Sequence, residues 1–307
     1  MIDTRMFICM DTTITIKVVS DQEEQQIDDV IKEAVRNFYQ IERICSRFDQ
    51  DSELMHLCQR AGEMVSVSST LYQAIKFAVE TAEETGGAFD PTIGRMMEQR
   101  GFNSNYLSGE RMCSTFAETS NVSYKDISMI DEKMGIYLKK PMVIDLNAVV
   151  KGMAVDLAVK TMRDAGFDNF IINAGGDIYA SGHNEQNEPW KIGIRNPSNR
   201  ETWIGFVQLS DEAICTSGDY ERPSTITPGE NHLLNPLRHK SPRELSSCTV
   251  ISPFTMLADA FSTAASVMGT EKGIKKMEEM QLDCLMLTHS SERYYTKNFK
   301  ENVSWTE

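Results

Sequence analysis

The stretch that decides the fold class is NFIINAGGDIYASGHNEQNEPWKIGIRNPSNRETWIGFVQL, residues 169–209. Its first part, 169–182, predicts a strand that runs into a glycine turn, and 190–197 and 202–209 predict two further strands rich in β-branched and aromatic residues. No helical pattern separates these segments. Consecutive strands of this kind indicate hairpins rather than strict strand–helix–strand alternation, and they favour an α+β fold.

Helical and extended patterns alternate on both sides of this stretch. Further strands are predicted at 12–19, 248–253 and 284–290, and 136–146 predicts a hairpin or strand pair. We therefore expect mixed or antiparallel sheets flanked by helices, and 307 residues allow one large or two medium domains. Apolar or small residues at helical spacing predict helices over 21–45, 69–85, 149–165, 258–269 and 271–280.

The chain is acidic, with 31 Lys and Arg against 45 Asp and Glu and a net charge of −14. Nucleic acids and anionic membrane surfaces are bound through Lys and Arg, so neither is an expected partner. No window reaches the roughly 18 apolar residues of a membrane span. The N-terminal segment lacks the pattern of a signal peptide or a lipidated cysteine. We expect a cytoplasmic protein as the sequence is written, with export possible if the N-terminus was trimmed.

The cysteines indicate neither a disulfide framework nor a zinc site, because they are odd in number, scattered and without a CxxC pair. We expect free thiols, buried or half-buried, in a reducing compartment. The seven are Cys9, Cys45, Cys58, Cys113, Cys215, Cys248 and Cys284.

Four polar segments follow predicted strands or lie in loops, and three of them allow both a structural and a ligand-binding interpretation. Asp145 follows the apolar residues MVI and either caps the next helix or accepts hydrogen bonds from a ligand. NAGGDI (173–178) is either a tight turn or a close backbone approach to an anion. TSGDY (216–220) offers small hydroxyls for phosphate or ring-edge contacts. His232, in a long polar loop over 222–247, is either solvated or a base near neutral pH.

Asp259 and Thr263 are four residues apart in the predicted helix ADAFSTAASVMG (258–269). A carboxylate and a hydroxyl at this spacing lie on one face of the helix. Both are hard oxygen donors of the kind that Mg²⁺ prefers, and Mg²⁺ typically takes one or two protein carboxylates. The alternative is that Asp259 caps the helix and Thr263 packs, and the residues alone leave both open.

In combination and in order, nine motifs resemble the ApbE family, the FAD:protein FMN transferases. The resemblance spans residue 10 to about residue 269. The motifs are Met10-Asp11-Thr12, SRFDQDSEL (46–54), TGGAFDPTIG (85–94), IDLNAVVKGMAVD (144–156), NAGGDI (173–178), WKIGIRNP (190–197), TSGDYER (216–222), HLLNP (232–236) and ADAFSTA (258–264).

The resemblance implies one large T-fold-like domain over residues 1–307 that binds FAD and Mg²⁺. The implied reaction moves the FMN half of FAD onto a Thr or Ser hydroxyl of an acceptor protein and releases AMP. The metal would be held by the carbonyl of Ala148 with Asp259 and Thr263, and His232 would act as the base. The implied FAD contacts are Met10, Phe48, Ala88, Phe89, Asp90, Asp145, Lys151, Gly176, Asp177, Ser217, Gly218 and Leu234.

The sequence departs from the family pattern at three places. Asp11 replaces the Gly of Met-Gly-Thr, and Asn147 replaces a Gly of DLGGIAKG. In the region of HIIDPxTG, Asn235 replaces the Asp and Arg238-His239 replace the Thr-Gly. Asn tolerates positive φ, so the turn at Asn147 is expected to keep its geometry. The loss of the carboxylate at Asn235 leaves two alternatives beside transfer: an FAD pyrophosphatase, or a protein that only binds FAD.

Overall fold

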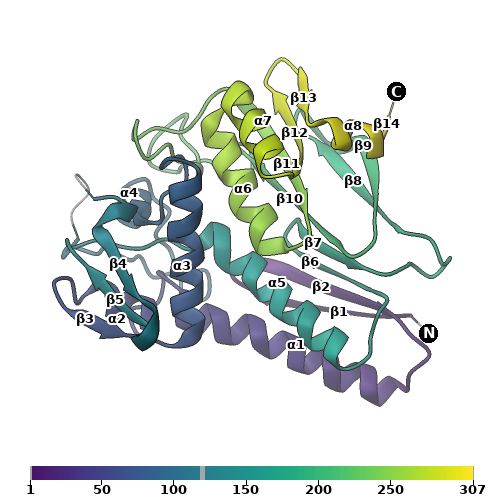
Figure 1. The fold of residues 1–307 in the computed structure, drawn as a ribbon, viewed down its shortest axis with the longest axis horizontal. Helices are drawn as coiled ribbons and strands as arrows, with labels where there is room; N and C mark the ends of the chain where they lie inside the picture. The colour runs from purple at the N-terminus through teal and green to yellow at the C-terminus, as the bar shows by residue number, and fades with distance from the viewer. Residues whose placement is uncertain (1, 118–121, 307) are drawn as a thin grey trace. The chain divides into compact units, whose positions relative to one another are not determined.

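The computed structural model describes residues 2–117 and 122–306, and its contacts divide the chain into two compact units (Figure 1). Unit 1 comprises 1–39, 151–218 and 244–307, and unit 2 comprises 40–150 and 219–243. Two of the four unit boundaries, 39/40 and 150/151, fall within helices. The single domain expected over 1–307 stays a prediction. Residues 1, 118–121 and 307 lie outside the described ranges.

Unit 1 is built on an eight-stranded sheet in the order β1-β2-β6-β7-β10-β11-β12-β13, with every neighbouring pair antiparallel. This confirms the predicted α+β class with antiparallel sheets. The strands are β1 (Ile2–Cys9), β2 (Thr12–Val19), β6 (Phe170–Ala174), β7 (Asp177–Ser181), β10 (Glu212–Gly218), β11 (Leu245–Ser252), β12 (Asp283–Thr288) and β13 (Arg293–Tyr295).

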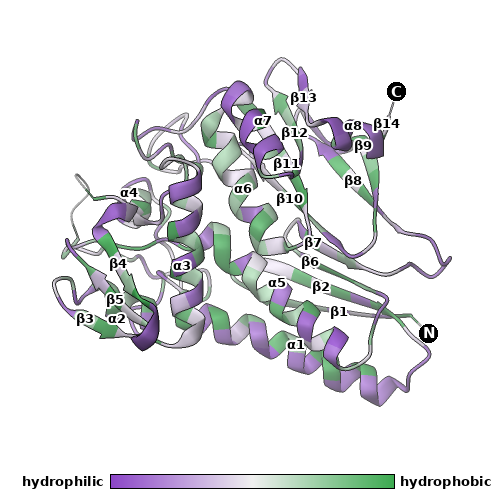
Figure 2. Cartoon of the chain, in the orientation of Figure 1, coloured by the Kyte–Doolittle hydropathy of each residue, from purple (hydrophilic) through white to green (hydrophobic). Residues whose placement is uncertain are grey.

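A second, three-stranded sheet in the order β14-β9-β8 shares a hydrophobic core with the large sheet. Ile192 and Val207 of the small sheet and Leu285 of the large one are among the buried members of this core. Figure 2 shows the hydrophobic residues running along the strands of unit 1. The strands are β8 (Trp190–Asn196), β9 (Asn199–Leu209) and β14 (Val303–Trp305).

Helices accompany the large sheet, and α6 packs against β10 and β11. Asp156 of α5 accepts hydrogen bonds from the backbone N–H groups of Thr255 (2.7 Å) and Met256 (3.0 Å), the first two residues of α6. Gly152 permits this approach, since a Cβ there would lie 2.4 Å from the Met256 Cα. The helices of unit 1 are α6 (Thr255–Met268), α7 (Thr270–Glu279), α8 (Lys297–Asn302) and parts of α1 (Glu24–Cys45) and α5 (Asn147–Asp164).

Two hairpin turns form one end of the large sheet. Met10 and Asp11 join β1 to β2 with φ values of 54° and 57°, and Gly175 and Gly176 join β6 to β7 with φ values of 65° and 105°. A two-residue turn with positive φ at both positions matches the twist of the strands that it connects. A Cβ on Gly175 would lie 2.2 Å from Thr12 Oγ1, so glycine is required at this position.

Unit 2 contains a small sheet in the order β3-β5-β4, short helices and the long segment 219–243. No named helix or strand occurs within that segment, as expected for the predicted loop. The elements are α2 (Glu53–Cys58), β3 (Met64–Ser66), α3 (Ser69–Glu84), η1 (Pro91–Ile93), α4 (Gly94–Gln99), η2 (Tyr124–Asp126), β4 (Ile127–Ile130), η3 (Asp131–Lys133) and β5 (Gly135–Leu138).

The predicted hairpin or strand pair over 136–146 is wrong in its second half. β5 ends at Leu138, and no strand follows before α5. Val143 O accepts from Gly94 N, and Asp145 N donates to Pro91 O, so these backbone groups are satisfied by residues of α4 and η1. An apolar run therefore lies buried without joining a sheet.

The cysteine prediction is confirmed for six residues, which are free and buried, whereas Cys113 is free and exposed. Among residues 2–117 and 122–306, no helix combines the length and apolar character that crossing a membrane requires.

Candidate active site

Half of the predicted site residues belong to unit 1, and the sheet brings several of them to one end. Strand pairing places Ala174 opposite both Ile14 and Asp177, so the turns that hold Met10 and Gly176 lie at the same end. Ile214 pairs with Ile178, and β10 continues from there past that end. Strand register thus brings the strand and turn residues among them to one end, whereas Lys151, Asp259 and Thr263 lie on helices α5 and α6. The eight predicted site residues of unit 1 are Met10, Lys151, Gly176, Asp177, Ser217, Gly218, Asp259 and Thr263.

Three of these residues, a half-buried lysine and two buried acids, form a charged group, here called the lysine cluster: Lys151, Asp177 and Asp259. Lys151 Nζ donates a hydrogen bond to Asp177 Oδ2 and lies 3.5 Å from Asp259 Oδ2. The side chains are 21%, 6% and 7% exposed, respectively. Two carboxylates thus share one ammonium group at a largely desolvated position, and the cluster carries an excess negative charge when all three groups are ionised.

Hydroxyl groups lie beside this cluster on α6 and β10. Ser217 Oγ is 2.8 Å from Ser262 Oγ and 3.1 Å from Thr263 Oγ1. Cys215, also on β10, donates to Thr255 O, and burial raises the pKa of its thiol well above the ordinary value, with Asp259 adding to the effect. The thiol therefore stays protonated, and the donors that this region offers to a metal are oxygen atoms.

The helix-cap alternative for Asp259 is wrong. α6 begins at Thr255, so Asp259 lies in its second turn, and Asp156 binds the N–H groups at the helix start. The sequence motif IDLNAVVKGMAVD contains Asp156, but nothing in the sequence shows that its carboxylate reaches a helix about 100 residues later.

The residues present fit a magnesium ion better than an all-protein metal cage. Among the described residues there is no group of three or more His, Cys, Asp or Glu able to hold a metal. Asp259 and Thr263 provide one carboxylate and one hydroxyl on one helix face, which suits an ion that keeps waters and takes substrate phosphate oxygens. The metal set proposed from the sequence remains a prediction.

The glycine turn is a tight turn, as the structural interpretation predicted. Gly176 N donates to Asn173 Oδ1 at 2.8 Å, so this N–H is engaged within the turn. The turn instead places Asp177 at the first position of β7. Its contribution to the site is the position of that carboxylate.

In unit 2, Asp145 forms a buried ion pair with Arg47, here called the arginine pair. Arg47 Nε donates to Asp145 Oδ2 at 2.6 Å, with the side chains 1% and 7% exposed. Arg47 also lies over the Phe48 ring, 4.1 Å from Cζ to the ring centroid. Asp145 Oδ1 accepts from Asn147 N, the first residue of α5, so the carboxylate satisfies one N–H group at the helix start and has a second partner.

Sequence reasoning missed Arg47, although it directly precedes Phe48 in SRFDQDSEL. Its Nη1 is buried without a hydrogen-bond partner among the described residues. A buried Arg beside an aromatic ring and an acid is the signal that could have identified it, but the acid lies 98 positions away in sequence. Arg47 connects two residues, Phe48 and Asp145, that were proposed separately as FAD contacts.

Ala88 is half-buried, and the neighbouring Phe89 and Asp90 are buried. Asp90 accepts hydrogen bonds from Thr92 N (2.9 Å), Thr92 Oγ1 (2.8 Å) and Tyr124 N (3.1 Å). Burial raises the pKa of Asp90, and these hydrogen bonds oppose the rise. The carboxylate is therefore engaged in holding the loop, and its contact with FAD stays a prediction.

The remaining predicted residues of unit 2 are Ala148, His232 and Leu234. Ala148 has φ −88° and ψ 19°, a kink within the first turn of α5, which takes its carbonyl out of regular helical geometry. His232 is half-buried in the loop, and its N–H donates to Arg222 O at 3.0 Å. The Leu234 side chain packs with Met96 and Met97.

Asn147 is the first helical residue and does not have positive φ, so the expected left-handed turn there is wrong.

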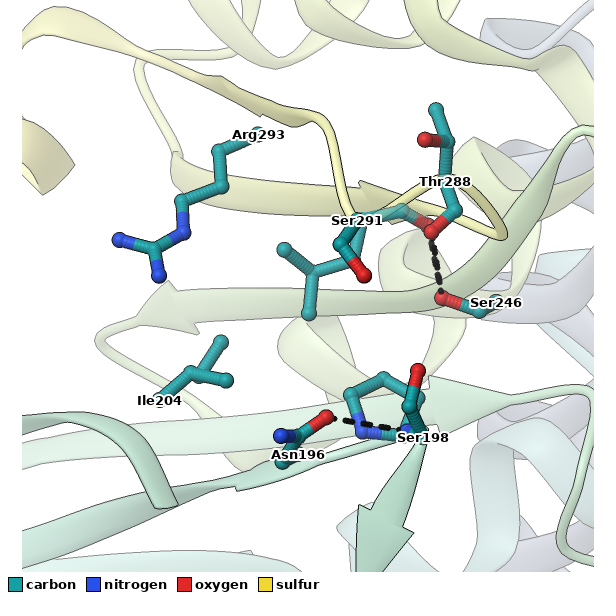
Figure 3. A pocket seen from close by; sticks show the side chains of 9 residues that line it. Asn196, Ser198, Ile204, Ser246, Thr288, Ser291 and Arg293 are labelled. Carbon is teal, nitrogen blue, oxygen red and sulfur yellow. Dashed lines mark hydrogen bonds between the residues drawn. The ribbon is translucent and has the colours of Figure 1, made fainter. Parts of the chain in front are cut away.

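A pocket of about 120 Å³ in unit 1 contains none of the predicted site residues (Figure 3). Ser246 donates to the backbone oxygens of Leu287 and Thr288 at its rim, so its hydroxyl is already satisfied. The lining residues are Asn196, Pro197, Ser198, Ile204, Ser246, Leu287, Thr288, Ser291 and Arg293.

Comparisons with known proteins agree with the resemblance. Residues 10–286 match the ApbE family. FAD:protein FMN transferase of Vibrio cholerae serotype O1 is 26% identical over 315 residues, covering 96% of this chain and 91% of the relative. The enzyme of the same name from Klebsiella pneumoniae is 25% identical over 288 residues, covering 88% and 81%. The crystal structure of the ApbE protein from Thermotoga maritima is similar with a TM-score of 0.87 and 28% identity, covering 98% of this chain and 99% of that one. The chain therefore belongs to the ApbE family.

Proposed function

We propose that this protein transfers the FMN moiety of FAD to a Thr or Ser hydroxyl of an acceptor protein, releasing AMP, with Mg²⁺ as the metal. The proposal is carried by one observation: the chain belongs to the ApbE family over residues 10–286, and relatives at 25–26% identity over most of their length are named FAD:protein FMN transferase. Asp259, the α6 acid of the lysine cluster, and the Thr263 hydroxyl one turn further along α6 support the metal.

Asp259 and Thr263 would hold Mg²⁺, which, when bound, supplies charge neutralisation at the FAD pyrophosphate. Lys151 adds a positive charge to the same region of unit 1. The acidity of the chain is compatible with an anionic substrate. The bound Mg²⁺ and the Lys151 ammonium, rather than the net charge of the chain, would face the phosphates.

In unit 2, Asp145 would accept a hydrogen bond from FAD while the arginine pair fixes its orientation. The Phe48 ring, already against the Arg47 guanidinium, would contact an aromatic ring of the substrate. His232 would take the proton from the acceptor hydroxyl as that oxygen attacks the FMN phosphorus and the bond to AMP breaks.

The test combines purified protein, FAD, MgCl₂ and a peptide that carries the Thr acceptor. We expect flavin fluorescence that stays with the peptide after denaturation, together with one AMP for each labelled peptide. AMP without labelled peptide would identify a pyrophosphatase, the alternative that Asn235 in place of the family Asp favours. Intact bound FAD would show that the protein only binds the dinucleotide.

A further inference from the structure

The lysine cluster contains one ammonium group between two buried carboxylates, and the two contacts are unequal. Lys151 is hydrogen-bonded to Asp177, whereas its Nζ is 3.5 Å from Asp259 Oδ2 and makes only an ion pair there. We propose that Asp177 is a positioning residue that keeps the Lys151 ammonium away from Asp259, so that Asp259 retains the negative charge needed to bind a divalent cation. The inference rests on the metal site of the proposed function.

All three residues lie on regular elements, but the lysine side chain is the longest and most flexible of the three. Asp177 is the first residue of β7, fixed by the glycine turn before it and by pairing with Ala174. Asp259 lies within α6. Lys151 reaches both through a flexible four-carbon chain. The location of the ammonium group is therefore decided by the relative attraction of the two carboxylates.

Removal of the Asp177 charge would leave Asp259 as the only anionic partner in the cluster. The ammonium group would then pair fully with Asp259, because an isolated buried charge is strongly unfavourable. A divalent cation would have to displace it and would experience its repulsion at short range. The structure thus gives Asp177 a role in metal binding although it need not touch the metal.

A simpler electrostatic account also predicts weaker metal binding when Asp177 is neutralised, because any nearby negative charge attracts a cation. The two accounts differ in their dependence on Lys151. If Asp177 acts by holding the ammonium group, its removal matters only when Lys151 is present. If it acts through space, its removal matters equally with and without Lys151. A double-mutant cycle measures this dependence.

The probe is Mn²⁺, titrated as MnCl₂ into the purified full chain, with free Mn²⁺ measured by electron paramagnetic resonance. We expect Asp177→Asn to weaken Mn²⁺ binding by about 10–100-fold, the range for a residue that supports a metal ligand. In the K151M background the same substitution should change binding by less than about threefold. Asp177→Ser removes the same carboxylate and serves if Asp177→Asn does not fold, which thermal denaturation will show.

An equal loss in both backgrounds, or no loss with Lys151 present, overturns the role of Asp177. Asp259→Ala separates this result from failure of the proposed function. If wild type binds Mn²⁺ and Asp259→Ala does not, the metal site stands and only the positioning role has failed. If wild type and Asp259→Ala bind Mn²⁺ equally or not at all, the metal site itself is wrong, and the inference falls with it.

Discussion

The lysine cluster of unit 1 and the arginine pair of unit 2 both contain buried carboxylates, but their charges balance differently. The arginine pair sets one guanidinium against one carboxylate, with both side chains at most 7% exposed. The lysine cluster sets one ammonium against two carboxylates. A balanced pair can hold a carboxylate in place so that it accepts a hydrogen bond from a neutral N–H or O–H group of a ligand. A cluster with excess negative charge retains affinity for a further cation, and local charge balance therefore distinguishes the two kinds of predicted site residue.

The largest expected effect is on stability, when the balanced pair is broken. Arg47→Ala leaves Asp145 buried without its counter-ion, and we expect a loss of about 3–5 kcal/mol in the free energy of unfolding. Chemical denaturation measures it. Arg60→Ala is the matched control, because Arg60 pairs with Glu63 at the surface, with side chains 52% and 60% exposed. It should change stability by less than about 1 kcal/mol. Similar losses in both variants would show that the arginine pair is not a special feature.

The next effect concerns activity and the unbalanced cluster. Asp259→Ala should reduce Mg²⁺-dependent turnover of FAD by more than about 100-fold, beyond the range for residues that only support a metal ligand. Release of AMP at a series of MgCl₂ concentrations measures it. Asp164→Ala, which removes an exposed acid of α5, should behave as wild type. Turnover by Asp259→Ala at the wild-type rate would remove the metal assignment.

Asp156, a third carboxylate of unit 1, has the N–H groups of a helix start as its partners instead of a cation. The pH dependence of its contribution to stability tests that difference. Burial raises the pKa of Asp156 against the lowering effect of its hydrogen bonds. The folded state therefore binds the proton more tightly than the unfolded state, and the contribution of Asp156 to stability increases as pH falls through the folded pKa.

We expect the stability of wild type relative to Asp156→Asn to rise as pH falls from 7 towards 4. One proton limits this slope to about 1.4 kcal/mol per pH unit. Urea denaturation across that pH range provides the measurement. A stability difference that is constant with pH, or that falls at lower pH, would contradict the raised pKa.

The smallest expected effect is at the turn between β1 and β2, which carries no buried charge. Asp11 has φ 57°, where glycine is preferred. Asp11→Gly should relieve strain of about 1 kcal/mol but add entropy to the unfolded chain. We expect a gain in stability of at most about 1 kcal/mol by thermal denaturation. A clear loss would indicate that the Asp11 side chain stabilises the turn.

Local patterns in the sequence predicted the helices α1, α3, α5, α6 and α7 and the central strands, because their apolar periodicity is strong, but missed the short elements α2, α4, β3 and β4. The edge strand β1 was missed because Asp3 and Arg5 interrupt its apolar residues, and β13, α8 and β14 are short. The segment after Leu138 was misassigned because its apolar run is buried without a strand partner.

The site was predictable where one helix carries the pattern and unpredictable where the fold supplies the contact. The spacing of Asp259 and Thr263 is visible in the sequence. By contrast, Lys151 reaches Asp177 across 26 positions and Arg47 reaches Asp145 across 98. These contacts depend on tertiary structure, and no local pattern encodes them.

The claim that Asp259 of the lysine cluster stays available to bind a cation is tested most directly by a crystal structure of the protein, from crystals grown with MnCl₂ and FAD. We predict an anomalous-scattering peak with oxygens of Asp259 and Thr263 at about 2.1 Å, typical of a small hard cation, and Lys151 paired with Asp177. A structure without such a peak, in which Lys151 hydrogen-bonds to Asp259 instead, would contradict it.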